Sequence, residues 1–279
     1  MALFGAHVSS AGSILKTFDR AKEVTAEVFQ FFLRSPRAWR WKGVSNELVN
    51  TFSQELQNFG KPVMVHAPYL LNLASADLEL RNRSISVFLE ELELCDRAGI
   101  HFYNFHPGTA KGISEEEALR NIVSSLERVF NSYEPKTTTV LLENTAGERG
   151  DMGKNFSELK EIIDRFPGVK LGVCIDTCHA FAYGYEINKE VGFSRFLSEI
   201  ERTIGFDRIK AIHANDSKVP LGGRRDRHEH IGEGFIGYEG FRNFLRHEYL
   251  RELPYYIETP KTGGMDIVNL NRLREIYSL

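Results

Sequence analysis

Six short apolar runs of this sequence end, one after another, in a side chain that can bind a metal ion. In chain order these side chains are His66, His106, Glu143, Asp176, His213 and Glu258. A single histidine or carboxylate after an apolar run is more often a hydrogen-bonding loop residue than a ligand. Six in succession do not fit that explanation, because burying several carboxylates together is costly unless cations neutralise them. The pattern therefore predicts a metal site, and imidazole with carboxylate suits Zn²⁺, Mn²⁺ or Fe²⁺ better than Ca²⁺ or Mg²⁺.

A second group of ligand-type residues lies in the long stretch between His213 and Gly234, which we expect to be a loop without regular structure. Structureless loops longer than ~12–15 residues in a compact domain are usually functional or disordered. Asp226 and His228 stand two residues apart, so both can face one metal ion in an extended chain. With His179 they would complete a second ligand set. His230 shares the alternation, but its neighbour Glu229 favours a surface histidine.

Two cysteines, Cys174 and Cys178, bracket Asp176. The two-residue alternation of a strand places Cys174 on the same face as Asp176, one layer deeper, and leaves Cys178 beyond the strand. Geometry therefore leaves a thiolate ligand open. A free cysteine is more often a small buried apolar residue, and we favour that interpretation for both.

The elements that must position these residues alternate along the chain. The β-like runs are Leu3–His7, Val28–Leu33, Pro62–His66, Phe102–His106, Thr138–Glu143, Leu171–Asp176, Ile209–His213 and Tyr255–Glu258. Amphipathic stretches lie between them, such as Asp77–Ala98 and Ser114–Phe130, where Ser114 followed by Glu117 indicates a capping box. Eight strands alternating with helices predict an α/β fold, a single (β/α)8 TIM barrel over residues 1–279, although an open doubly wound sheet shares much of the pattern. In a barrel the carboxyl ends of the strands converge on one face, where active sites lie.

Length and composition agree with a barrel-sized domain. The chain has 279 residues, of which 42% are hydrophobic, enough for a large core. No apolar run approaches the ~18–20 residues that span a bilayer, and the first residues turn polar too early for a signal peptide. Three cysteines are an odd number and too few for a disulfide scaffold, which indicates a reducing, cytoplasmic setting.

The net charge of -3 argues at first against a nucleic-acid binder. However, both tryptophans, Trp39 and Trp41, lie among four cations in the segment Arg34–Lys42. This segment is either the start of a helix with cation–π packing or a loop that holds a polyanion backbone. Further positive charge stands in the long loop, at Arg224, Arg225 and Arg227.

Several ordered motifs resemble those of the endonuclease IV family, the zinc-dependent apurinic/apyrimidinic (AP) endonucleases of DNA base-excision repair. The resemblance runs from Gly5-Ala-His-Val-Ser to Glu258-Thr and includes His66-Ala-Pro-Tyr-Leu-Leu-Asn-Leu, Asn104-Phe-His-Pro-Gly, Glu143-Asn-Thr-Ala-Gly, Gly172-Val-Cys-Ile-Asp-Thr-Cys-His, His213-Ala-Asn-Asp-Ser-Lys and Asp226-Arg-His-Glu-His-Ile-Gly-Glu-Gly-Phe-Ile-Gly. It implies one (β/α)8 barrel with three Zn²⁺ ions per chain, and Mn²⁺ suits the same ligands.

The resemblance also implies a role for each site residue. The first metal ion would be held by His66, His106 and Glu143, the second by Glu143, Asp176, His213 and Glu258, and the third by His179, Asp226 and His228. Glu143 and Glu258 would be the catalytic residues. The DNA contacts would be Arg37, Tyr69, Leu70, Arg224 and Arg225. Cysteines are not ligands in the family.

The implied activity is hydrolysis of the phosphodiester 5′ to an abasic site, leaving a 3′-hydroxyl and a 5′-deoxyribose phosphate, together with repair of blocked 3′ ends. The implied partner is damaged double-stranded DNA, bound by a monomer. Three divalent ions would turn the net charge slightly positive and focus it at the barrel mouth, so mild acidity does not exclude nucleic acid.

Two other functions are compatible with parts of this pattern. A metal-dependent sugar isomerase or epimerase shares the barrel and a Glu/Asp/His/Glu site, but it needs one or two metal ions and has no use for Asp226, His228 or the tryptophan–arginine segment. A non-catalytic binder of damaged DNA would bind the abasic duplex without cutting it, and a complete ligand set argues against that.

Overall fold

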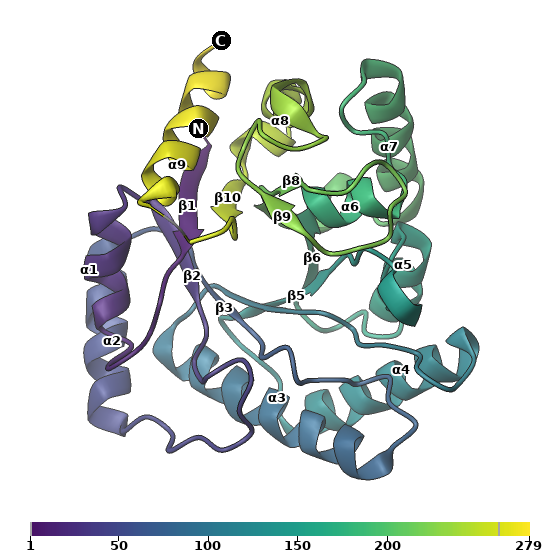
Figure 1. Ribbon diagram of the computed structural model, residues 1–279. Coiled ribbons are helices and arrows are strands. Elements are labelled where there is room, and N and C mark those ends of the chain that lie inside the picture. Colours follow the sequence, from purple (N-terminus) through teal and green to yellow (C-terminus); the bar gives the residue numbers. More distant parts are fainter. Residues whose placement is uncertain (1, 262) are drawn as a thin grey trace.

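The computed structural model describes residues 2–261 and 263–279. Eight parallel strands form a closed barrel in the order β1-β10-β7-β6-β5-β4-β3-β2, and the helices surround it (Figure 1). The barrel strands are β1 (Leu3–His7), β2 (Val28–Phe31), β3 (Val63–His66), β4 (Phe102–Phe105), β5 (Thr139–Glu143), β6 (Leu171–Asp176), β7 (Ile209–His213) and β10 (Pro254–Ile257). The helices are α1 (Lys16–Glu23), α2 (Asn46–Phe59), α3 (Leu78–Ala98), α4 (Glu115–Ser132), α5 (Phe156–Ile163), α6 (Thr177–Tyr183), α7 (Glu190–Thr203), α8 (Gly237–Arg246) and α9 (Met265–Ser278). Short 3-10 turns span Glu148–Gly150, Phe206–Arg208 and Leu250–Glu252.

Closure of the sheet confirms the predicted TIM barrel and excludes the open doubly wound alternative. The first strand pairs with the last, with Leu3 opposite Pro254, and it also pairs with the second, with Gly5 opposite Val28. No edge is left among the eight strands, so their carboxyl ends form one ring.

Three predicted strands end earlier than the sequence suggested. The first is β2, which ends at Phe31, two residues before the predicted Leu33. β4 ends at Phe105 because Pro107 restricts the backbone of His106 and offers no N–H to a neighbouring strand. β10 ends at Ile257, and the N–H of Glu258 donates instead to Oδ1 of Asn215 at 2.7 Å. Both ligand-type side chains therefore stand just beyond their strands, at the mouth of the barrel.

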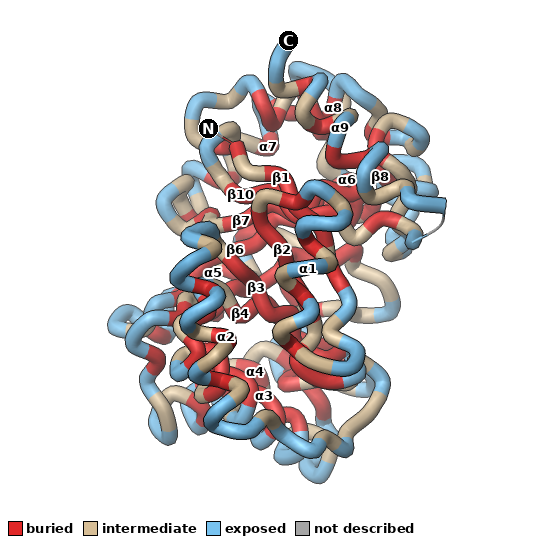
Figure 2. The backbone as a smooth tube through the Cα atoms, turned by 90° about the vertical axis from the view of Figure 1, so that its left-hand side faces the viewer, coloured by how far each residue is buried: buried red, intermediate tan, exposed pale blue. Residues whose placement is uncertain are grey.

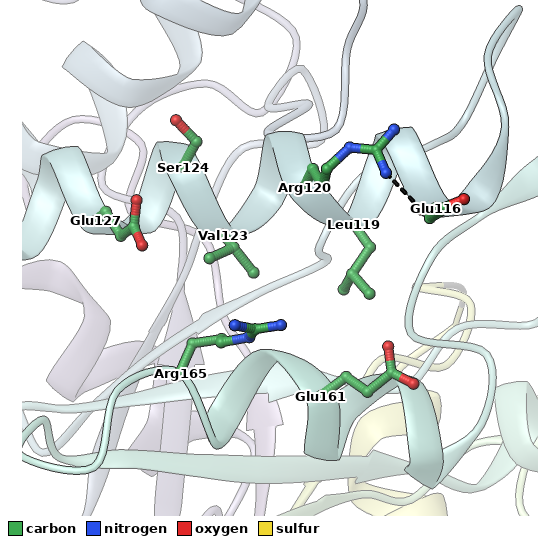
Figure 3. Close-up of a pocket in the computed structure, with 8 residues that line it drawn as sticks. All are labelled: Glu116, Leu119, Arg120, Val123, Ser124, Glu127, Glu161 and Arg165. Carbon is green, nitrogen blue, oxygen red and sulfur yellow. Dashed lines mark hydrogen bonds and ion pairs between the residues drawn. The ribbon is translucent and has the colours of Figure 1, made fainter.

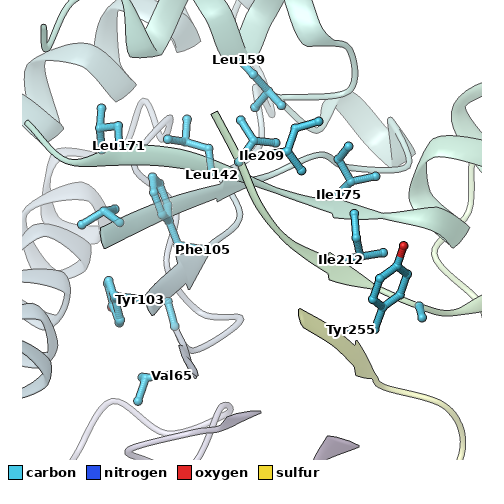
Figure 4. Close-up of a cluster of buried hydrophobic side chains, with 14 of the residues drawn as sticks. Val65, Tyr103, Phe105, Leu142, Leu159, Leu171, Ile175, Ile209, Ile212 and Tyr255 are labelled. Atoms are coloured by element: carbon cyan, nitrogen blue, oxygen red, sulfur yellow. The ribbon is translucent and has the colours of Figure 1, made fainter. Parts of the chain in front are cut away.

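Two-residue alternation divides the strand residues between two layers. Outward side chains such as Phe105, Leu142 and Ile212 pack in one core with side chains of the helices, for example Leu159 of α5 (Figure 4). A smaller inner layer fills the barrel and comprises Val28, Met64, Leu141, Cys174, Ala211 and Tyr256. Figure 2 shows the strands buried along their length and the helices exposed on their outer sides. The polar residues that follow the inner layer by two positions face the barrel mouth.

Gly5 marks the closest approach between two barrel strands. A Cβ atom at this position would lie 1.7 Å from the carbonyl oxygen of Val28. That distance is far inside van der Waals contact, so only glycine fits where β1 passes β2.

Ser114 caps its helix as predicted, and Asp77, the first residue of the predicted stretch Asp77–Ala98, is the N-cap of α3. Ser114 Oγ accepts from the N–H of Glu117 at 3.2 Å, and Asp77 Oδ1 accepts from the N–H of Glu79 at 2.9 Å. Each side chain satisfies an N–H that lacks a partner within the first turn. The helices on either side of β4 therefore begin where the sequence indicated.

The stretch after β7 is not the structureless loop that we expected. β8 (Asp216–Ser217) pairs antiparallel with β9 (His228–Glu229), with Ser217 opposite His228. The buried carboxylate of Asp216 then accepts hydrogen bonds from the backbone N–H groups of Ser217, Gly232, Gly234, Ile236 and Gly237. These bonds hold both ends of the stretch and fix the position of Asp226 and His228 between them.

No helix in the described part of the chain is long and apolar enough to cross a membrane. The cysteines Cys95, Cys174 and Cys178 are free and buried.

Candidate metal centre

The nine predicted ligands gather at the carboxyl ends of the strands, in the three groups that the sequence analysis proposed. Within each group the candidate ligand atoms lie within 4.8 Å of one another, and the groups are His66, His106 and Glu143; Glu143, Asp176, His213 and Glu258; and His179, Asp226 and His228. Glu143 belongs to two groups. The first two groups are therefore continuous with each other.

Glu143 is the centre of this cluster and is fully buried. Its Oε2 lies 3.2 Å from Nε2 of His66 and 3.2 Å from Nε2 of His106. Its Oε1 lies 2.9 Å from Nδ1 of His213. One carboxylate thus faces histidines on both sides, which is the arrangement that a bridging ligand needs.

Asp176 joins the second group to the third. It is the N-cap of α6, where its Oδ1 accepts from the N–H of His179 at 2.8 Å. Its Oδ2 lies 3.5 Å from Nε2 of His228. Because the same carboxylate caps the helix that carries His179, the strand end and the helix start set the two side chains in one geometry.

The third group contains two imidazole nitrogens that face a single carboxylate oxygen. Oδ1 of Asp226 lies 3.3 Å from Nε2 of His179 and 3.1 Å from Nε2 of His228. Both nitrogens are buried without a hydrogen bond of acceptable geometry. Buried polar atoms normally find a partner, so a pair of such nitrogens beside a carboxylate is the chemistry of a metal site.

Hydrogen bonds on the far side of each ring support this assignment. Nδ1 of His66 lies 2.7 Å from the carbonyl oxygen of Ala67, Nδ1 of His179 lies 2.9 Å from that of Asn144, and Nδ1 of His228 lies 3.2 Å from that of Glu258. A carbonyl can only accept, so each Nδ1 carries a proton, and in the neutral form of each ring Nε2 presents a lone pair to the cluster. Metal-binding histidines are held in this way.

His213 faces the cluster with Nδ1 rather than Nε2, and Gln30, which was not among the predicted site residues, explains why. Nε2 of Gln30 donates to Oε1 of Glu258 at 2.6 Å, so the amide oxygen of Gln30 faces His213 and lies 2.8 Å from its Nε2. His213 therefore presents Nδ1 to Glu143. Gln30 is a buried polar residue in the apolar strand β2, and its inward place in the alternation was a usable signal.

Three asparagines were also missed, and each positions a ligand. Nδ2 of Asn104 donates to Oε2 of Glu143 at 2.5 Å, and Nδ2 of Asn215 donates to Oδ2 of Asp176 at 2.7 Å. Oδ1 of Asn144 accepts from the N–H of Asp176 at 2.8 Å. The sequence could have indicated them, because each asparagine stands within two residues of a predicted ligand.

Without metal ions, the charges of the cluster balance by protonation of its histidines. Burial alone would raise the pKa of Glu143, but His213 and His106 outweigh it and hold that pKa well below its usual value. Burial would lower the pKa of His179, but Asp176 and Asp226 raise it well above its usual value. The carboxylates therefore attract cations to this site, protons in one state and metal ions in another.

Two comparisons decide the family. A family model described as a xylose isomerase-like TIM barrel matches residues 18–275. A protein of Aquifex aeolicus named "Probable endonuclease 4" is 72% identical over 277 residues, which are 99% of this chain and 98% of the relative. This chain belongs to the endonuclease IV family.

Solved structures similar to this chain include an endonuclease IV and a barrel of another enzyme class. Endonuclease IV from Thermus thermophilus has a TM-score of 0.85 and 30% identity, covering 99% of both chains. A D-tagatose 3-epimerase-like protein has a TM-score of 0.73 and 21% identity, covering 99% of this chain and 97% of its own. The second likeness shows a shared fold alone. Of the two enzyme classes that the sequence left open, the family is that of the nuclease.

The five predicted DNA contacts lie at or near the surface of the folded chain. Arg37, Arg224 and Arg225 are exposed, the side chain of Tyr69 is 58% exposed, and Leu70 is half-buried. The ring of Tyr69 contacts those of His66 and His106, with centroids 5.7 and 6.5 Å apart. Arg224 and Arg225 directly precede Asp226. Tyr69 therefore lies against the metal-ligand cluster, whereas the guanidinium of Arg224 lies 5.3 Å from the ring centroid of Tyr183.

The tryptophan–arginine segment is a loop and not the start of a helix, since α2 begins at Asn46, but it does contain the predicted cation–π packing. The guanidinium of Arg34 lies 4.6 Å from the ring centroid of Trp41, and that of Arg83 lies 4.7 Å from that of Trp39. Arg34 is buried and paired with glutamates. Of the four cations, Arg34 is therefore not free to contact DNA.

The cysteines beside Asp176 differ in their surroundings. Cys174 lies in the inner barrel layer, and burial raises the pKa of its thiol to about 12, so it stays neutral. Sγ of Cys178 comes within reach of Asp176 and His228. It donates to the carbonyl oxygen of Arg227 at 3.5 Å, and burial raises its pKa as well. Both behave as small buried residues in this structure.

A groove of about 530 Å³ lies elsewhere, in the helical layer between α4 and α5 (Figure 3). Leu119 and Val123 point from α4 toward Glu161 of α5 and Arg165 in the turn after it. It shares no residue with the ligand groups and holds no histidine. The candidate active site is therefore the strand-end cluster.

Proposed function

We propose that this protein hydrolyses the phosphodiester bond 5′ to abasic sites in double-stranded DNA, leaving a 3′-hydroxyl and a 5′-deoxyribose phosphate. We include in the proposal the release of blocking groups from 3′ ends, which needs the same cleavage at a strand terminus. The observation that supports it most is the continuous cluster in which Glu143 is shared between two ligand groups and Asp176 reaches the third.

The cluster fits three Zn²⁺ ions, with Mn²⁺ compatible with the same donors. The ligands would be His66, His106 and Glu143 for the first ion, Glu143, Asp176, His213 and Glu258 for the second, and His179, Asp226 and His228 for the third. Divalent ions held there would acidify a water molecule and neutralise charge on a phosphate.

The protein's own contribution is to hold these donors in place. Glu143 is catalytic in this proposal because its two oxygens face both sides of the cluster, with the neutral amide of Asn104 donating to one of them. Glu258 is the second catalytic carboxylate, held by Gln30 and facing Nδ1 of His213 at 3.3 Å. Such preorganisation avoids rearrangement as charge develops in the transition state.

Recognition of the damage would fall to the exposed side chains beside the cluster. Arg37, Tyr69 and Leu70 would enter the duplex where the base is missing, and Arg224 and Arg225 would contact phosphates. A nucleotide without a base costs less to extrude than a paired one, which favours the damaged site. Positive charge concentrated here would bind DNA despite a net charge of -3.

The domain organisation, the oligomeric state and the location of the protein form part of the same proposal. We propose that residues 1–279 act as one domain, because the barrel uses strands from Leu3 to Ile257. We also propose that the protein acts as a monomer in the cytoplasm.

The third ligand group distinguishes this proposal from a sugar epimerase. Such an enzyme needs one or two metal ions and has no use for Asp226 and His228 beside His179. The carboxylate of Asp216 accepts hydrogen bonds from Gly232 and Ile236, which hold the β8–β9 stretch that carries Asp226 and His228.

One experiment tests the proposal. The purified protein is incubated with a labelled duplex that contains one tetrahydrofuran abasic analogue, with and without EDTA, and with an undamaged duplex as control. We expect a single cut 5′ to the analogue that EDTA abolishes, and about three metal ions per chain by elemental analysis. An intact damaged duplex in both lanes would overturn the proposed activity, and one or two ions per chain would contradict the three-metal site.

A further inference from the structure

The segment that carries Arg37 is a tight turn. The N–H of Ala38 donates to the carbonyl oxygen of Ser35 at 3.1 Å, which closes a turn with Pro36 and Arg37 at its centre. Proline favours this position because its φ is already suited to the turn. Arg37 therefore stands exposed at the tip, and its direction depends on how the base of the turn is held.

Arg34, at the base of this turn, is buried against α3. Its Nε donates to Oε1 of Glu91 at 2.6 Å and its Nη2 to Oε2 of Glu90 at 2.7 Å. Its Nη1 lies 3.5 Å from the carbonyl oxygen of Trp39, on the opposite side of the turn. One guanidinium thus connects both ends of the turn to one helix.

The two tryptophans complete the attachment. Arg34 lies over the ring of Trp41, and Arg83 of α3 lies over the ring of Trp39, at 4.6 and 4.7 Å from the ring centroids. Both rings also pack against the hydrophobic core. The segment is therefore attached to α3 by two separate cation–π contacts besides the ion pairs.

Stability alone does not explain a buried ion pair at this position. Glu91 is fully buried and also accepts from the hydroxyl of Tyr103 at 3.1 Å. Removing two charges from water costs about as much as their attraction returns, and apolar residues often replace such pairs without loss. The guanidinium fork adds direction, because it binds carboxylates and stacks on rings in one fixed orientation.

We propose that Arg34 and Glu91 act as a brace that holds the Arg37 turn ready for the damaged duplex before DNA binds. Arg34 is a positioning residue in this scheme, and the inference rests on the proposed function for the identity of the substrate. A turn held in advance loses less conformational freedom on binding, so the brace strengthens binding of the abasic duplex rather than the cleavage step.

Intrinsic fluorescence gives a direct readout of this segment. The chain has two tryptophans, and both, Trp39 and Trp41, lie beside the turn. The variant that removes the brace is Arg34→Met with Glu91→Gln, since glutamine keeps an acceptor for Tyr103. In the EDTA-treated protein we expect stronger acrylamide quenching than in the wild type. In the zinc-loaded protein we expect KM for the abasic duplex to rise about tenfold, with kcat changed less than about twofold.

A second pair of variants tests the same brace on the protein surface. Arg83→Ala removes the contact with Trp39 from an exposed position of α3. Arg97→Ala is its matched control, because Arg97 is an exposed arginine of the same helix that bonds to Asn46, away from the turn. We expect Arg83→Ala to increase quenching and to raise KM about threefold, and Arg97→Ala to change neither.

Each outcome supports or overturns the brace. Wild-type quenching and KM in the double variant would overturn it, as would a lowered Tm with unchanged quenching, which indicates a structural role alone. If the double variant does not fold, the exposed Arg83→Ala variant decides by the same two readouts. A wild-type protein that leaves the abasic duplex intact would overturn the proposed function, whereas the quenching comparison would still test the brace.

Discussion

Gln30 and His213 are 183 residues apart in sequence, and the amide oxygen of one lies 2.8 Å from Nε2 of the other. The same amide donates to Glu258 at 2.6 Å. One uncharged side chain on β2 therefore orients two candidate ligands of the second metal group. It also determines which nitrogen of His213 faces Glu143.

We expect Gln30→Leu to weaken zinc binding by about 10- to 100-fold, because the two ligands lose the hydrogen bonds that orient them. Competition with a chromophoric chelator measures this affinity without any DNA. Gln54→Leu is the matched control, since Gln54 is an exposed glutamine on α2. Equal zinc affinities for the two variants would contradict the positioning role.

We expect Glu143→Gln to lower cleavage of the abasic duplex by at least about a thousandfold, since the amide removes the charge shared by two ligand groups. Metal content should fall in the same preparation. Glu127→Gln, at an exposed site on α4, should retain full activity and metal content. Undiminished turnover in the Glu143 variant would refute the bridging role.

The pH dependence of stability should differ between the metal-free and zinc-loaded protein. In the metal-free state burial alone would lower the pKa of His228, but Asp176 and Asp226 raise it to about 9 from an ordinary value of 6.5. Because the pKa of His228 is higher in the folded than in the unfolded protein, binding of its proton stabilises the fold. This contribution is complete below about pH 6.5 and is lost as the pH rises through about 9.

Calorimetry over pH 6.5–9 checks that difference. We expect the Tm of the EDTA-treated protein to fall with rising pH through this contribution, and His228→Gln to flatten the fall. The increase in Tm caused by zinc should grow over the same range, because metal ions bind only the neutral imidazole. An EDTA-treated wild type whose Tm is as flat as that of the variant would contradict the assigned pKa.

Gly5→Ala should destabilise the barrel by more than about 3 kcal/mol, because the new Cβ would overlap the carbonyl of Val28 and force β1 and β2 apart. Urea unfolding measures the change. Gly168→Ala is the control, since a Cβ there meets no atom within 4 Å, and it should be neutral or stabilising by up to about 1 kcal/mol. Similar losses in both variants would show that the close approach at Gly5 is not the cause.

The sequence by itself predicted the barrel, with an open sheet as the alternative, and the nine candidate ligands that the fold brings together. Strand alternation and helix caps are local properties, so Asp77 and Ser114 marked helix starts, and the inward position of Glu143 followed from its place at the end of an apolar run. Residue spacing proposed the set of His179, Asp226 and His228, and the family resemblance divided the other six ligands into two sets. The geometry of the folded chain agrees with both.

Only the tertiary structure decided which polar residues hold the ligands and which cations are free. Gln30 reads as one polar residue in an apolar strand until barrel closure brings it against His213. Arg34 looks like a DNA-binding arginine until α3 places Glu91 beside it at 2.6 Å. Asp216 stands in an apparent loop until its carboxylate meets backbone groups up to 21 residues away. A hydrogen bond requires atoms about 3 Å apart, and for residues far apart in sequence that distance is set by strand register and helix packing, which no local pattern records.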